Sequence, residues 1–487
     1  MSTGIHPLFL DPTRRLAPPT AESWRPTRTA AENRCPGFLN GLLWQIVLCS
    51  ALVAGLLGAG KLAWSGRCFW IVFGLVLVRL IVMRQPAELL CLLIGTAPLS
   101  NLLRETAFYN VVVVLFGAGL MFYFFHAPGT VRTVMRRAPL AIALLVYATI
   151  YYSLSLWFTG SYSTNLRLFD LGFAVVALLL MGRNRRLLGT ALLGMMIASC
   201  AVGLGMLPYN DTVGRLGMVR IDGYTLGNPA ELGLSLALAF LALTVDRGHW
   251  VNLDHKPVIR FLLLVPVVTL LALTTSRVGW LVAVTGLVVA LLFRSRARFG
   301  ILIAIALAFV AIRLVLLSPF GSAVQTGLDR TFSSERSVAN RTSGRSDQWL
   351  VASTAFTDSM SSLMFGHGPG RGADAYAHYS TAVEGVRYGV GERRALHSLF
   401  MQVMVEAGLL GLLPLIVWLL CATWRILQWM LATRWIFPLV CFLGYGLIVL
   451  TVSGNDTASG TYMGIGLLAT LQPIRSNKTE PGDHAQR

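Results

Sequence analysis

Charged residues are scarce in this chain of 487 residues. Asp, Glu, Lys and Arg together make up 13% of it, whereas 55% is hydrophobic and the mean hydropathy is +0.66. A soluble globular protein carries roughly 25% charged residues. The composition therefore excludes an ordinary soluble domain and indicates a chain that lies largely in lipid.

The motifs of several enzyme classes are also missing. The sequence contains no P-loop motif, no HExxH and no CxxC, which argues against a nucleotide-driven or zinc-dependent site. His367, Asp374 and His378 match no metal-ligand spacing, so we predict no metal and no cofactor. The seven cysteines lie mostly inside apolar runs, where a small buried side chain is the expected role; they are residues 35, 49, 68, 91, 200, 421 and 441.

Long apolar runs recur from Phe38 almost to the C-terminus. A helix of about 20 apolar residues crosses the hydrocarbon core, and lipid cannot satisfy an open backbone, so these runs must be helices. We predict an all-α polytopic integral membrane bundle of about 12–14 transmembrane helices. The expected spans are residues 38–60, 68–83, 87–103, 107–126, 138–158, 166–182, 187–206, 225–245, 258–274, 278–293, 299–318, 396–421, 435–452 and 458–472.

Lys and Arg alternate between sparse and dense loops along the chain. If the N-terminal tail is cytoplasmic, the dense loops, such as the one with Arg132, Arg136 and Arg137, all fall on the cytoplasmic side, as membrane orientation requires. Both termini are then cytoplasmic. The formal net charge of +18 is spread over these short clusters, which argues against a nucleic-acid partner.

One segment interrupts the pattern of spans. Residues 319–395 are polar, too long for a connector and non-cytoplasmic by the alternation, and long structured loops usually carry function. Within them, residues 346–365 have apolar side chains at helical spacing, which predicts an amphipathic helix on the bundle or on the membrane surface. The predicted organisation is a basic disordered tail (1–36), a transmembrane bundle (37–318), a large loop (319–395), C-terminal transmembrane helices (396–473) and a second tail (474–487).

Arginines gather on the non-cytoplasmic face, where orientation rules make them scarce. Arg277 lies in TTSRVG between two apolar runs, and Arg215 and Arg220 lie in the loop before the eighth span. Snorkelling at a helix end or attraction to anionic headgroups would explain some of them. A cluster of guanidinium groups also fits a polyanion, because their planar fork matches phosphate oxygens; a diphosphate on a lipid is the natural candidate.

Two further segments accompany these arginines. In GNPAELG (227–233), Asn228 can cap a helix that begins at Pro229, and the same helix start could instead lie beside a ligand. In ALHSLFMQVMVEAGLLG, His397 begins an otherwise apolar helix. A lone interfacial histidine is often structural, but nearby cationic charge favours the neutral imidazole that a general base requires.

Four segments, in this order, resemble the O-antigen ligase superfamily, which also contains polysaccharide polymerases and some protein O-oligosaccharyltransferases. They are GNPAELG with a preceding arginine, TTSRVGW, GRSDQWLVASTAF followed by FGHGPG, and LHSLFMQVMVEAGLLG. The resemblance implies that Arg220 and Arg277 hold a diphosphate and that His397 activates the acceptor hydroxyl. Arg215, Arg341, Arg345 and Asn228 are further substrate-binding candidates. The histidine is commonly followed by asparagine in that family, whereas this chain has Ser398.

The resemblance implies a metal-independent membrane glycosyltransferase of the bacterial inner membrane whose active site faces the periplasm. It would move a glycan from an undecaprenyl-diphosphate carrier to lipid A–core, as an O-antigen ligase in lipopolysaccharide biosynthesis, with residues 319–395 as the large periplasmic loop. The first alternative is an O-antigen or exopolysaccharide polymerase, whose acceptor is a second lipid-linked glycan. The alternative of another class is a lipid-linked glycan transporter or flippase, which should place its polar groups near the membrane midplane.

Overall fold

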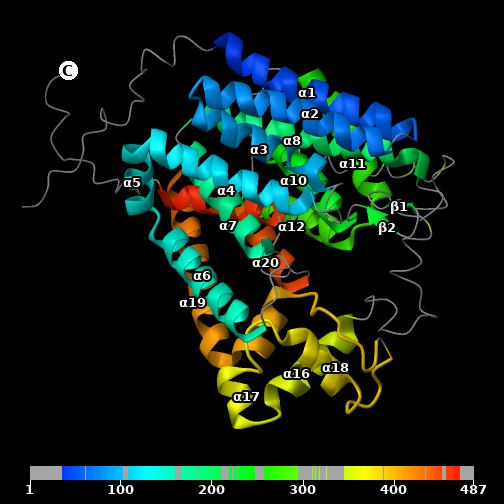
Figure 1. The fold of residues 1–487 in the computed structure, drawn as a ribbon, viewed down its shortest axis with the longest axis vertical. Coiled ribbons are helices and arrows are strands. Elements are labelled where there is room, and N and C mark those ends of the chain that lie inside the picture. The colour runs from blue at the N-terminus through cyan, green and yellow to red at the C-terminus, as the bar shows by residue number, and fades with distance from the viewer. Residues whose placement is uncertain are drawn as a thin grey trace, which may run out of the picture. The chain divides into compact units, whose positions relative to one another are not determined.

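The fold is seen in a computed structural model (Figure 1). Contacts divide the chain into Met1–Gly41, of which only residues 36–41 are described, and Leu42–Arg487, to which all packing below belongs. The described residues are 36–60, 62–101, 108–159, 166–182, 184–209, 219–221, 224–226, 229–246, 257–293, 306, 310, 313, 317, 325, 345–387, 389–433, 435–451 and 457–471.

The described residues are almost entirely helical. The helices before the first strand are α1 (Pro36–Gly58), α2 (Leu62–Val82), α3 (Pro86–Asn101), α4 (Phe108–His126), α5 (Pro128–Arg137), α6 (Pro139–Thr159), α7 (Leu166–Met181) and α8 (Arg185–Met206), followed by a 3-10 turn at Leu207–Tyr209. A two-stranded antiparallel hairpin of β1 (Val219–Ile221) and β2 (Tyr224–Leu226) precedes α10 (Pro229–Thr244), α11 (Pro257–Leu273) and α12 (Arg277–Phe293).

The C-terminal part contains a group of short helices and then longer ones. The short helices are α16 (Arg345–Thr357), α17 (Met360–Phe365) and α18 (Gly372–Ser380). They are followed by α19 (Leu399–Thr433), α20 (Phe437–Thr451), α21 (Thr457–Leu468) and a 3-10 turn at Ala469–Leu471. We call residues 345–398 the loop region; in Figure 1 its helices are yellow and lie together beside the start of α19.

The prediction of an all-α polytopic membrane fold is confirmed. Every predicted span except 299–318, which lies outside the continuously described ranges, coincides with one of these helices. In the described part, Gly41–Gly58, Arg186–Met206 and Leu399–Thr433 are long and apolar enough to cross a membrane, and the α4–α5 pair, bent by 106°, is a fourth candidate. Several shorter apolar helices of 10–17 residues accompany them. The number of spans and the domain boundaries stay predictions.

Small residues bring the central helices close together. Gly95 of α3 and Gly194 of α8 face one another, since a Cβ atom built on Gly194 would lie 3.3 Å from the Cα atom of Gly95. A Cβ atom on Gly460 of α21 would lie 2.8 Å from the Ala174 side chain of α7. Such contacts are typical of membrane helices, which gain stability from close packing because lipid offers no hydrophobic driving force between them.

The predicted amphipathic helix 346–365 differs from the structure. Residues 346–357 belong to α16, and the chain breaks at Ser359, whose hydroxyl oxygen accepts a hydrogen bond from the Ser362 backbone N–H at 3.1 Å and caps α17. The buried side of α16 is made by Asp347, Gln348, Val351, Ala352 and Ala355, whereas Trp349 and Leu350 are exposed. The apolar spacing correctly predicted a helix. The face of α16 that packs against the protein, however, includes the polar residues Asp347 and Gln348 and not Trp349 or Leu350.

Candidate active site

The TTSR turn joins α11 to α12 by local capping. The Thr274 hydroxyl donates to the Leu271 carbonyl at 2.8 Å, and the Ser276 hydroxyl oxygen accepts from the Gly279 backbone N–H at 3.3 Å. Ser276 is thus the N-cap of α12, which makes Arg277 its first helical residue. Thr275 has a φ of 48°, a left-handed conformation that is rare for a β-branched residue and is often retained at functional sites.

The start of α10 packs directly on this turn. A Cβ atom built on Gly233 would lie 2.3 Å from the Ser276 Cβ atom, and one on Gly279 would lie 2.8 Å from the Gly233 carbonyl oxygen. Only glycine at both positions permits this approach. Two of the predicted motifs, GNPAELG and TTSRVGW, are therefore in contact. Arg220 pairs with Thr225 in the hairpin just before α10.

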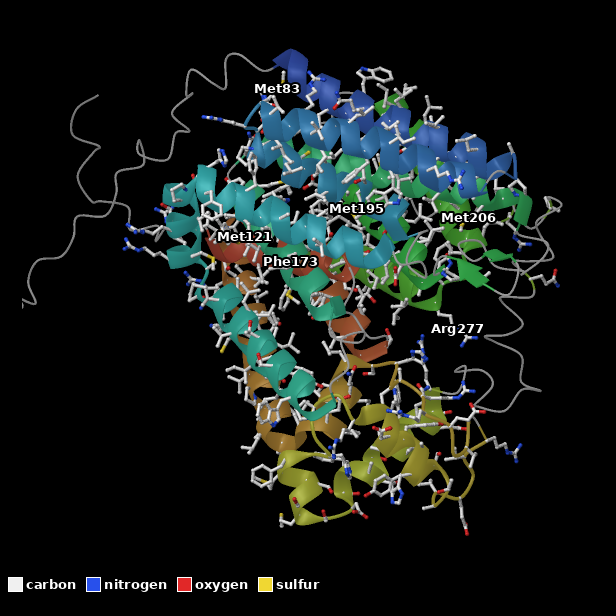
Figure 2. The ribbon with its side chains drawn as sticks, in the orientation of Figure 1. Met83, Met121, Phe173, Met195, Met206 and Arg277 are labelled. Atoms are coloured by element: carbon white, nitrogen blue, oxygen red, sulfur yellow. The ribbon has the colours of Figure 1, made fainter. Side chains whose placement is uncertain are left out.

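The first turn of α16 lies within electrostatic range of the TTSR turn. Burial lowers the pKa of the Arg345 guanidinium, and the positive charge of Arg277 lowers it further. The two arginines, both half-buried, are thus close enough to repel one another, although they come from different parts of the sequence. Figure 2 shows Arg277 between the green helices of the bundle and the yellow helices of the loop region.

The same turn of α16 holds the segment that leads to His397. The Gln348 side-chain amide, which is buried, donates to the Ala395 carbonyl at 3.4 Å, and the buried Asp347 carboxylate accepts from the Arg387 backbone N–H at 2.9 Å. Ala395 precedes His397 by two residues. Gln348, three residues after Arg345 in α16, therefore holds the segment through which the chain enters α19.

His397 is exposed and stands immediately before the cap of α19. That cap is Ser398. Its hydroxyl oxygen accepts a hydrogen bond from the Met401 backbone N–H at 3.4 Å, and its O–H group donates to the Val449 carbonyl of α20 at 3.1 Å. Ser398 is buried. Serine and asparagine are both strong N-caps, so the departure from the common His-Asn pair preserves the function of a cap.

The three predicted site residues whose side chains the structure describes, Arg277, Arg345 and His397, each lie at or just before a helix N-terminus. Arg277 and Arg345 are the first residues of α12 and α16, and His397 precedes α19. The Gln348–Ala395 hydrogen bond links the start of α16 to the segment that leads to α19, and the charge of Arg277 acts on Arg345. Arg215, Asn228, Arg341 and the side chain of Arg220 lie outside the described part, and the roles of all seven residues stay predictions.

Glu406 is the centre of a polar cluster that the sequence did not reveal. Its buried carboxylate accepts hydrogen bonds from the backbone N–H groups of Gly370 at 2.6 Å and Gly372 at 3.0 Å. It also accepts from the Tyr151 hydroxyl of α6 and from the Gln402 amide, the latter at 3.2 Å. The glycine-rich loop, the first part of α19 and α6 are thereby joined through one carboxylate, which we call the Glu406 hub.

A break in α19 lies beside the Glu406 hub. Gly408 has φ 60° and ψ −155° inside the helix, and Gly366 has φ 71°. Because the break interrupts the helical pattern, the Val405 and Glu406 carbonyls accept from the backbone N–H groups of His367 at 2.8 Å and Gly368 at 3.0 Å. A Cβ atom on Gly408 would lie 2.6 Å from the carbonyl carbon of Met364, so the loop backbone occupies the space of a missing side chain.

An acidic side chain inside an apolar helical run is expected to pair with another helix. Tyr151 of α6 is such a partner of Glu406, but the loop backbone supplies two of the four hydrogen bonds that the carboxylate accepts. The available signal was GHGPGRG, because Gly366, Gly368 and Gly370 all adopt positive φ angles and such turns expose backbone N–H groups. Its anionic partner lies 34–36 residues further along the chain and could not be identified from the motif.

His367 and Asp374 of the loop region each contact another group of the protein. The His367 Nε2 atom lies 2.8 Å from the Ala355 carbonyl oxygen, and the Asp374 carboxylate pairs with Arg393 at 2.6 Å. Within the described ranges, no three His, Cys, Asp or Glu side chains are grouped so that they could hold a metal ion.

The comparison with protein families agrees with the motifs. The family model for O-antigen ligases matches residues 261–416, which run from α11 to the first half of α19 and include Arg277, Arg345, His397 and Glu406. The similarity to this superfamily that the motifs predicted is therefore confirmed. No curated protein matches the chain.

Proposed function

We propose that this protein is a membrane glycosyltransferase that moves a glycan from an undecaprenyl-diphosphate carrier to an acceptor sugar, as an O-antigen ligase. The family match supports the ligase and polymerase superfamily as a whole. The observation that carries the proposal is the approach of Arg345 to Arg277 at half-buried positions. Bringing like charges together costs free energy, and an anionic ligand between them would offset that cost.

Helix geometry supports an anion at this place. The N-terminus of a helix carries partial positive charge from its unpaired N–H groups. An arginine as the first residue of α12 and another as the first residue of α16 are therefore placed where a cation is least stable. Both the side chains and the helix ends favour a phosphate group, and a diphosphate supplies two.

The proposed reaction needs only these residues and the two substrates. The His397 imidazole takes the proton of the acceptor hydroxyl while its oxygen attacks the anomeric carbon of the glycan. The bond between that carbon and the diphosphate oxygen breaks, and the undecaprenyl diphosphate leaves with the electron pair. Arg277 and Arg345, and Arg220 from the hairpin, stabilise the charge that develops on the leaving oxygen.

The test uses the purified protein in proteoliposomes with labelled undecaprenyl-diphosphate glycan and acceptor. His397→Ala should bind the donor normally but transfer it roughly 10²–10⁴-fold more slowly, the usual contribution of a general base. Arg277→Ala should lose donor affinity as well as rate, and Arg277→Lys should restore only part, because lysine cannot form the bidentate contact. Arg425→Ala, an exposed arginine far along α19, is the control. Wild-type transfer by both His397→Ala and Arg277→Ala would refute the assignment.

A polymerase uses the same donor chemistry and belongs to the same superfamily, so the acceptor has to be tested separately. In a deletion strain, loss of a ligase leaves long chains on the carrier that are not attached to lipid A–core. Loss of a polymerase leaves single repeats that are not extended. The ligase proposal predicts the first outcome, and accumulation of single repeats would replace it by polymerase.

A further inference from the structure

The short helix α17 exposes two large apolar side chains. Met360 is 73% exposed and Phe365 is 64% exposed, and they stand at the two ends of the helix. The surface of the loop region also exposes Trp349, Leu350 and Val390, among polar residues such as Glu384, Glu392 and Arg393. Two exposed apolar groups of this size on one short helix indicate a contact surface.

The place where α17 joins the bundle identifies what covers this surface. The backbones of Met364 and Gly366, on either side of Phe365, press against Gly408 at the break in α19. Immediately after the break α19 exposes an apolar stripe at the 3-4 spacing of a single helix face: Leu410, Leu413, Val417, Leu420 and Trp424. Phe365 therefore lies within about two helical turns of the first residues of this stripe.

The second helix at the Glu406 hub has a similar stripe. Tyr151 of α6 donates to Glu406, and the residues of α6 that are exposed at the same spacing are Val146, Ile150, Leu154 and Trp157. In a membrane protein, apolar helix faces that the described part of the chain leaves uncovered are expected to face lipid. Exposed apolar residues of α6 and α19 thus lie near the point at which α17 is attached to α19.

The length of α19 after the break bears on how deep α17 lies in the membrane. From Leu409 to Thr433 the helix rises roughly 37 Å at about 1.5 Å per residue, which is enough to cross a core of ~30 Å without the residues before the break. This length allows the break, and α17 with it, to lie at the edge of the hydrocarbon core.

We propose that α17 is an interfacial anchor, in which Met360 and Phe365 insert among the lipid acyl chains at the membrane edge and hold the loop region there. This surface continues the lipid-facing stripe of α19, and the backbone hydrogen bonds at the break connect the anchor to the helix that His397 precedes. Amphipathic segments with a few large apolar residues bind membranes in this way. The anchor does not depend on the reaction proposed above.

Site-specific photo-cross-linking in native membranes tests the anchor in the full-length protein without any glycan substrate. A benzoylphenylalanine probe is placed at Phe365, with Leu413 as the lipid-facing reference and Glu384 as the exposed polar reference. After irradiation, mass spectrometry measures the phospholipid adduct. If α17 is interfacial, the adduct at 365 should be within about threefold of that at 413 and about tenfold above that at 384.

Two results would overturn the proposal. An adduct at 365 no larger than that at 384 would place Phe365 in water. A cross-link at 365 to a second copy of the chain, seen as a doubled mass on a denaturing gel, would assign the surface to a protein interface. Because failure at 365 leaves the transfer reaction of the wild-type protein untouched, this result is separable from a failure of the proposed function.

Discussion

The helical bundle and the loop region both depend on glycine, but for different physical reasons. In the bundle, Gly95, Gly194 and Gly460 adopt ordinary helical conformations and are needed only because a Cβ atom would meet a neighbouring helix. In the loop region and at the break, Gly366 and Gly408 adopt positive φ angles and also lack space. The bundle is thus specified by shape and the loop region by backbone conformation and hydrogen bonds.

The bundle and the loop region should also respond differently to a substitution. Packing contacts in the bundle are numerous and individually small, so a misfit at one glycine can be shared among neighbours. The loop region is attached to α19 through a few backbone hydrogen bonds and the Glu406 carboxylate. A buried carboxylate that loses its partners, or donors that lose their carboxylate, cannot be compensated locally. Substitutions should therefore have sharper effects at the junction than in the bundle.

Gly408→Ala should have the largest effect. It places a side chain in a backbone conformation that costs about 1–3 kcal/mol for non-glycine residues, and its Cβ atom would lie 2.6 Å from the Met364 backbone. We expect little monodisperse protein by size-exclusion chromatography in detergent and no measurable transfer. Gly446→Ala in α20, where a Cβ atom meets nothing within 4 Å, is the control and should behave as wild type. Normal yield and activity for Gly408→Ala would mean that the break is dispensable.

Glu406→Ala should be the next most damaging. It removes the acceptor of four donors, and each buried donor left unsatisfied costs about 1–3 kcal/mol. We expect a loss of about 4 kcal/mol or more in the free energy of unfolding, which is four donors at the lower figure, measured by thermal unfolding in detergent. Tyr151→Phe removes one donor only and should cost far less. Equal stability of Glu406→Ala and wild type would contradict the description of the Glu406 hub.

Gly279→Ala tests the bundle at the point where it supports the site. Its Cβ atom would lie 2.8 Å from the Gly233 carbonyl oxygen, and overpacking of this kind costs about 1–3 kcal/mol. The helices α10 and α12 should move apart slightly and displace Arg277, which precedes Gly279 by two residues. We expect transfer to fall roughly 10–100-fold, because small misplacements of a catalytic group are costly. Gly55→Ala, where a Cβ atom has open space, should leave transfer unchanged.

Ser398→Ala should have the smallest effect. Loss of an N-cap costs about 1 kcal/mol, so the thermal midpoint should fall by a few degrees and transfer by a few-fold as His397 loses its fixed neighbour. Ser398→Asn keeps a capping oxygen and should retain more activity than alanine. Ser353→Ala, an exposed hydroxyl on α16, is the matched control. If alanine and asparagine at 398 behave alike, the cap does not position His397.

The elements of the site were predictable because their signals are local. Ser276 caps α12 and Ser398 caps α19 through backbone N–H groups three residues away, so the arginine and the histidine next to them could be placed at helix starts. The approach of Arg345 to Arg277 was not predictable, since it depends on how α16 packs. The same holds for Glu406, whose acidic side chain in an apolar run indicated a buried partner without identifying it.

The sequence by itself determined that this chain is a bundle of membrane helices and where most of them begin and end. That information is local, because lipid requires each segment to satisfy its own backbone and to present apolar side chains along its length. Only the tertiary structure decided that α19 breaks at Gly408, that Glu406 binds the glycine-rich loop and that two arginines from separate helix starts come within electrostatic range of one another. These features depend on contacts between residues from 34 to 255 positions apart, and no local pattern specifies which donor finds which acceptor across such distances.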